Sequence, residues 1–104
     1  MRFLRFDWDP NKNAINQKKH GIGFDEAKTC FEDDYAEIFE DAEHSKDEER
    51  SILLGMSALL KTLIVVYTER IHDETNEMVN RIISARKATK AEFQYYWSRR
   101  PKVR

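Results

Sequence analysis

Apolar and polar positions alternate in some parts of the chain and recur at helical spacing in others, and this contrast predicts the elements. Alternation over residues 2–8 predicts a first strand with apolar side chains on both faces. The apolar, β-branched stretch 50–71 predicts two antiparallel strands with a turn near residues 57–61, although no Asn-Gly or Asp-Gly pair marks that turn. A short strand is predicted over 35–41 and a longer one over 79–87.

Capping residues predict two helices in the N-terminal third of the chain. Asp9 is the expected N-cap of the first helix, Pro10 its first residue and Gly21 its left-handed terminator. Basic side chains occupy its last turn, where positive charge suits the helix dipole: Lys18, Lys19 and His20. The segment 24–34 predicts a second, shorter helix, for which Asp25 is the expected cap.

A capping box predicts the final helix. In "TKAE", residues 89–92, the threonine hydroxyl can accept from the backbone amide of the glutamate, whose carboxylate can reach back. Phe93, Tyr96 and Trp97 share one face of this helix, and a basic tail is expected over residues 98–104.

The predicted order is a strand, two helices, a run of antiparallel strands and a helix. That order predicts an α+β fold in which two N-terminal helices and a C-terminal helix pack on one antiparallel sheet. The chain has 104 residues, enough for one domain spanning residues 1–104.

The cysteine count and the apolar runs bear on the compartment. Cys30 is the single cysteine, so an internal disulfide is excluded, a core role is expected and a reducing, cytoplasmic compartment is favoured. The alternating N-terminus does not have the pattern of a signal peptide, and the apolar run 63–67 is too short to span a bilayer. We therefore expect no membrane association.

A net charge of −1 conceals a strong asymmetry along the chain. Residues 32–49 contain ten acidic side chains against one lysine, which is typical of a solvated face. Residues 81–104 contain eight basic side chains against one glutamate, and this excess favours an anionic partner.

The residue pattern does not predict a metal site or a cofactor. His20, His44 and His72 occur singly without ligand spacing, and the acidic segment lacks the order of a calcium-binding loop. The better candidates are cations on the predicted strands and at the end of the first helix, which together would form a phosphate clamp: Lys18, Lys19, His20, Arg70, Arg81 and Arg86. Taken singly, each arginine is more typical of a cross-strand ion pair or of a surface side chain than of a phosphate site, and it is the grouping of the six cations that favours the clamp.

Strand alternation predicts how these candidates are distributed between the two faces of the sheet. Tyr67 and Glu69 share one face, and Arg70 lies on the other. On the last strand, Arg81 is expected on one face and Arg86 on the opposite one.

Such a clamp suits RNA cleavage without a metal, because the ribose 2′-OH supplies the nucleophile. Arginines would stabilise the charge on a phosphorane-like transition state. Glu69, His20, a lysine or Tyr67 would handle the protons. Aromatic side chains that could stack on unpaired bases, with core packing as the alternative, are Tyr95, Tyr96 and Trp8.

Three stretches resemble the BrnT family of type II toxins: "FDWDPNKNAINQKKHGIGFDEA", "VVYTER" and "RIISARKATKAEFQYY". The resemblance runs from about Phe6 to Tyr96. It implies a RelE-like fold and a ribonuclease that blocks translation. It also implies a BrnA-type antitoxin with a ribbon-helix-helix DNA-binding part, which would form a hetero-oligomer with the toxin and carry it to operator DNA.

Catalytic roles carry over from the family motifs to five residues: Lys19, His20, Glu69, Arg70 and Arg86. Substrate-binding roles are expected for four more: Lys18, Tyr67, Arg81 and Tyr95. The turn "MSALLKTL" is more apolar than the family pattern, and the acidic "FEDAEHSKDEE" would have to lie away from the cleft.

Two other functions fit the same residues. The cations could anchor a protein or nucleic acid in a non-catalytic module, or the acidic loop could bind a structural partner.

Overall fold

The computed structural model describes residues 4–44 and 49–100 of the chain. Part of the predicted acidic loop, residues 45–48, and of the predicted basic tail, residues 101–104, lies outside the described residues. The elements are, in chain order, β1 (Phe6–Asp7), α1 (Pro10–His20), α2 (Phe24–Ala27), η1 (Lys28–Glu32), β2 (Glu37–Glu40), η2 (Ala42–His44), β3 (Ser51–Met56), β4 (Thr62–Ile71), β5 (Met78–Lys87) and α3 (Lys90–Ser98).

The five strands form one sheet in the order β1-β5-β4-β3-β2. β2 to β5 pair antiparallel, as predicted, but β1 pairs parallel with β5, so the expectation of a wholly antiparallel sheet is wrong. The difference arises because the chain leaves β1, enters the sheet at the opposite edge and returns through successive reversals to lie beside β1. The finer RelE-like assignment stays a prediction.

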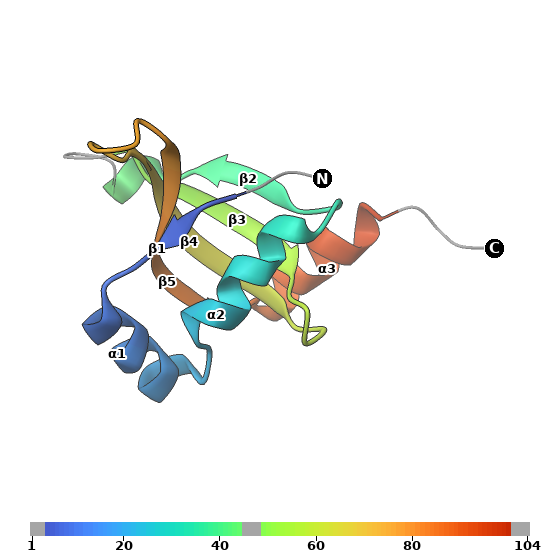
Figure 1. The fold of residues 1–104 in the computed structure, drawn as a ribbon. Helices are drawn as coiled ribbons and strands as arrows, with labels where there is room; N and C mark the ends of the chain where they lie inside the picture. Colours follow the sequence, from blue (N-terminus) through green and yellow to red (C-terminus); the bar gives the residue numbers. More distant parts are fainter. Residues whose placement is uncertain (1–3, 45–48, 101–104) are drawn as a thin grey trace.

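Helical segments cover both faces of the sheet (Figure 1). On one face, the segment from Ile22 to Cys30 packs its apolar side chains against Val65, Tyr67 and Ile82 of the sheet. On the other face, Tyr96 of α3 packs against Leu54 and Ile64 in a smaller core. The smaller core covers one end of this face. Arg86 lies beside it, and Arg81 and Arg70 lie on the part of the face beyond it.

The local start and stop signals act largely as predicted. The Asp9 side chain accepts from the Asn11 amide at 2.8 Å, and Gly21 ends α1 with a φ of 72°. Thr89 and Glu92 form the predicted capping box of α3. Of the three aromatic residues predicted to share one face of that helix, Phe93, Tyr96 and Trp97, only Tyr96 is buried, at 1% exposure.

The second helix begins one residue before its predicted cap. Gly23 is the N-cap and Asp25 lies inside the first turn, so the expected capping role of Asp25 is wrong. The start is fixed by Phe24, which is fully buried and whose amide donates to the Asn13 side chain at 2.9 Å. After Ala27 the segment continues as the 3-10 helix η1, which carries Cys30 into the core.

The outer edge of β5 is covered in two ways. The Asn80 amide donates to the Arg5 carbonyl beside β1, at 2.8 Å. Further along the edge, the buried side chain of Asn16 from α1 donates to the Ala85 carbonyl at 2.8 Å and accepts from the Ala85 amide at 3.1 Å. Asn16 thus takes the place of a neighbouring strand and attaches α1 to the sheet.

No helix among residues 4–44 and 49–100 is both long and apolar enough to cross a membrane.

Candidate functional site

A β-bulge places three arginines on the same face of the sheet. Val66 and Tyr67 are consecutive in β4 but pair with Ser84 and Ile82, so Ile83 is an extra residue in β5. Ile82 and Ala85 consequently both face the larger core. The side-chain alternation shifts by one residue across the bulge. The prediction that Arg81 and Arg86 lie on opposite faces of the sheet is therefore wrong.

Register identifies the residues on that face, which we call the arginine face. Arg86 is paired with Ile64, which packs under α3, and Arg81 is paired with Thr68. Arg70 lies two residues beyond Thr68 on the same strand and hence on the same face. The pairing positions of Arg86 and Arg81 are four residues apart on β4, about 13 Å at roughly 3.3 Å per residue. The arginines therefore form a row along the sheet.

The Arg86 guanidinium forms a two-pronged ion pair with Glu92 of α3. Nη1 donates to Oε1 at 2.8 Å and Nη2 donates to Oε2 at 3.0 Å. The hydrogen bonds from Arg86, together with the Thr89 amide, lower the pKa of Glu92 to about 2, and the same pairing raises the pKa of Arg86. Arg86 keeps 42% of its side chain exposed, so it is held in place while still facing solvent.

The other two arginines lie nearer the open end of the β4–β5 hairpin. Arg81 donates to Asp7 of β1 at 3.1 Å. Arg70 is exposed and lines a shallow cavity of about 280 Å³ together with Asp7 and His72. Arg81 is paired with one carboxylate, and the cavity beside Arg70 is lined by three, from Asp7, Asp73 and Glu74. Carboxylates are the ion-pair partners expected of ordinary surface arginines.

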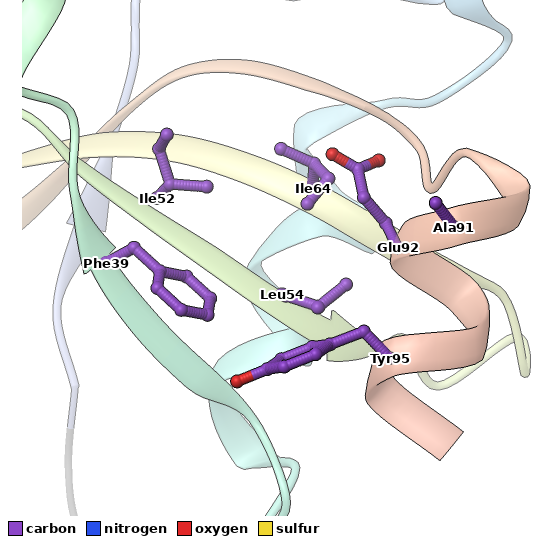
Figure 2. Close-up of a pocket in the computed structure, with 7 residues that line it drawn as sticks. All are labelled: Phe39, Ile52, Leu54, Ile64, Ala91, Glu92 and Tyr95. Atoms are coloured by element: carbon purple, nitrogen blue, oxygen red, sulfur yellow. The ribbon is translucent and has the colours of Figure 1, made fainter. Parts of the chain in front are cut away.

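An apolar groove of about 450 Å³ opens beside the Arg86–Glu92 pair. Figure 2 shows the groove between α3 and the sheet, with the rings of Phe39 and Tyr95 on one side and the Glu92 carboxylate near Ile64. Tyr95 is 40% exposed, and its hydroxyl donates to Glu37 at 3.2 Å. The predicted substrate-binding residue Tyr95 is thus a wall of this groove.

Tyr67 and Glu69 lie on the opposite face of the sheet, as their alternation predicted. Tyr67 is 3% exposed and packs edge-on against Phe31, and burial is the main reason that its pKa is raised. Glu69 is exposed and lines a cavity of about 370 Å³ with Asp34 and Asn80. The sheet therefore separates Glu69 from the arginines.

The basic end of α1 lies near the Arg86 end of β5. Asn16 contacts Ala85, the residue before Arg86, and His20 follows Asn16 by four residues, about 6 Å along a helix axis. Lys18 and Lys19 are exposed and His20 is half-buried. Glu69 lies farther from this end. It follows Val65, the β4 residue that pairs with Ala85, by four residues.

The sequence does not indicate the contact that Glu92 makes with Arg86. "TKAE" indicated a helix start, and nothing in the spacing indicated that the same carboxylate would also hold Arg86. Asp7 was missed similarly, because its contact with Arg81 depends on the parallel pairing of β1. Among residues 4–44 and 49–100, no group of three or more His, Cys, Asp or Glu side chains is arranged to hold a metal ion.

Comparisons with known proteins agree with the motifs. The family described as "Ribonuclease toxin, BrnT, of type II toxin-antitoxin system" matches residues 8–92. The fold is similar to the crystal structure of the Brucella abortus ribonuclease toxin BrnT, with a TM-score of 0.59 and 22% identity over 85% of this chain and 100% of that chain. No curated protein matches the sequence. Since the match spans most of the chain, this protein belongs to the BrnT family of ribonuclease toxins of type II toxin–antitoxin systems.

Proposed function

We propose that this chain cleaves RNA without a metal ion, by promoting attack of a ribose 2′-OH on the adjacent phosphate. Arg86 would contact the phosphate and stabilise the charge that develops on it. Arg81 and Arg70, further along the same face, would bind the neighbouring backbone. The row formed by the three arginines supports an extended strand of RNA as the ligand.

The proton transfers are proposed for the end of α1. His20 or Lys19 would accept the 2′-OH proton or protonate the leaving oxygen, with Lys18 adding positive charge. Their support is the attachment of α1 to β5 beside Arg86, through the Asn16 side chain. Glu69 remains a candidate base from the family motif, but an RNA strand on the arginine face would have to pass around the sheet edge to reach it.

A single observation carries this proposal. Arg86 is partly exposed to solvent and yet fixed by a two-pronged ion pair, on the same face as two further arginines. Positioned guanidinium groups suit a reaction in which the protein supplies no nucleophile, because positioning and charge stabilisation are then its main contributions.

Cleavage of a defined RNA in the presence of EDTA tests the proposal. We expect products with 2′,3′-cyclic phosphate ends, and an RNA with a single 2′-deoxy substitution at the cleavage site should stay intact. Arg86→Ala should reduce cleavage to a small residual rate without unfolding the protein. Arg5→Ala is the matched control, because Arg5 is also exposed and paired, at 2.9 Å to Glu77. Dependence on a divalent metal would contradict the mechanism.

We further propose that the toxin blocks translation in the cytoplasm and is neutralised by a BrnA-type antitoxin with a ribbon-helix-helix part. The apolar groove next to Arg86 supports this, because a partner that fills it would also cover the arginine face. An equimolar complex should be inactive in a cell-free translation assay that the free toxin stops. Operator DNA should bind the complex and not the toxin alone.

One observation favours a second function, a non-catalytic RNA-binding module. Arg81 and Arg86 already have carboxylate partners, as is typical of anchoring or structural arginines. This alternative predicts that RNA is retained by the purified protein and recovered intact.

A further inference from the structure

The N–H groups of Arg86 divide into two sets. Nη1 donates to Glu92 and also to the Lys87 carbonyl, at 2.8 and 3.2 Å, and Nη2 donates to Glu92 at 3.0 Å. A guanidinium has five N–H groups, so the Nε–H and one Nη2–H have no partner among the described residues. Because the guanidinium is planar, fixing three donors also fixes the directions of the other two.

The start of α3 holds Glu92 in turn. Its Oε1 accepts from the Thr89 amide at 2.8 Å, and its own amide donates to the Thr89 hydroxyl at 3.2 Å. The side chain projects from α3 toward Ile64 (Figure 2), which is the strand partner of Arg86. Only two residues, Ala88 and Thr89, separate β5 from α3, so the helix start and the arginine belong to one short structural unit.

We infer that Glu92 is a positioning residue for RNA cleavage: its carboxylate holds the Arg86 guanidinium so that the two remaining N–H groups face the scissile phosphate. The inference rests on the proposed function. Glu92 does not touch the substrate. Without Glu92, the Arg86 side chain would sample several rotamers. Its guanidinium would lose its fixed orientation but keep its charge.

This role predicts an effect on the chemical step more than on RNA affinity. Glu92→Ala should lower the single-turnover cleavage rate by roughly 10- to 100-fold, since a misplacement of about 1 Å in an active site can cost on the order of 100-fold. RNA affinity should change little, because the cationic charge of the arginine face is unchanged or increased. Glu92→Gln should fall in between, since glutamine can still serve in a capping box but carries no charge.

Two controls separate positioning from a structural role. Thr89→Ala removes the hydroxyl cap of α3 but leaves the Thr89 amide and the Arg86–Glu92 pair, so it should lose stability and keep cleavage. In an Arg86→Ala background, adding Glu92→Ala should have no further effect on the rate, because there is no guanidinium left to hold.

The possible outcomes separate a failure of this inference from a failure of the proposed RNA cleavage. Cleavage that depends on Arg86 but is unchanged or faster in Glu92→Ala overturns the inference and leaves the proposed function standing. So does an equal loss in Thr89→Ala, or a full additional loss in the double variant. If the unchanged protein does not cleave RNA, or if Arg86→Ala cleaves normally, the proposed site and the inference both fail.

Discussion

Replacing Asn16 with alanine should destabilise the protein more than an alanine substitution at any exposed position of α1. The Asn16 side chain is 6% exposed and makes three hydrogen bonds. Its amide donates to the carbonyls of Ile22 and Ala85, each at 2.8 Å, and its oxygen accepts from the Ala85 amide at 3.1 Å. Truncation would leave these backbone groups buried without partners.

The size of the effect follows from the number of bonds. Each lost bond contributes about 1 kcal/mol, and a buried polar group left unsatisfied costs about 1–3 kcal/mol. Alanine recovers at most about 0.7 kcal/mol through its higher helix propensity. We therefore expect a loss of about 3–5 kcal/mol from the free energy of unfolding, out of a total of about 5–15 kcal/mol for a domain of this size.

Urea denaturation followed by tryptophan fluorescence and circular dichroism measures this loss. Asn11→Ala is the matched control, because Asn11 lies on the same helix and is exposed. The reasoning is refuted if Asn16→Ala and Asn11→Ala give the same free energy of unfolding. Asn16→Asp should be at least as damaging at neutral pH, since a buried carboxylate would then face the two carbonyls.

Three further outcomes are expected. Tyr96→Phe should lower the free energy of unfolding by about 1.5–3 kcal/mol, because the buried hydroxyl donates to the Asp33 carboxylate; urea denaturation checks it. The folded-state pKa of Glu92, about 2, lies below its ordinary 4.5, so the stability from its pair with Arg86 is present above pH 4.5 and is lost as the pH falls toward 2. After discounting for exposure this is on the order of 1 kcal/mol, and a Glu92→Gln variant whose acid denaturation matches that of the unchanged protein would contradict it. Cys30, fully buried and with its pKa raised to about 12 mainly by burial, should not react with a thiol reagent at pH 8 until the protein is unfolded.

Local signals made parts of the fold predictable from sequence. Asp9, Gly21 and Thr89 act within a few residues of their own positions, so the boundaries of α1 and α3 follow from the chain alone. The turn between β3 and β4 also lies where the apolar pattern placed it. The parallel pairing of β1 with β5 joins residues more than 70 positions apart, and no local pattern encodes it.

The candidate site was predictable in composition but not in arrangement. The arginines, the basic end of α1 and Tyr95 could be named from the sequence, and so could the shared face of Tyr67 and Glu69. Alternation alone placed Arg81 and Arg86 on opposite faces, because the extra residue Ile83 shows only in the pairing with β4. Glu92 was recognised as a capping residue, whereas its bond to Arg86 requires the packing of α3 on the sheet.

The bulge at Ile83 also limits how this strand can change during evolution. The side-chain alternation of β5 is shifted by one residue between its two halves. The inserted residue Ile83 allows both halves to keep their apolar side chains on the same face. Deleting that residue would turn every side chain on one half of β5 over, sending either Arg81 toward the apolar interior or Ala85 out of it. Substitutions along β5 should therefore be tolerated more readily than any change in its length.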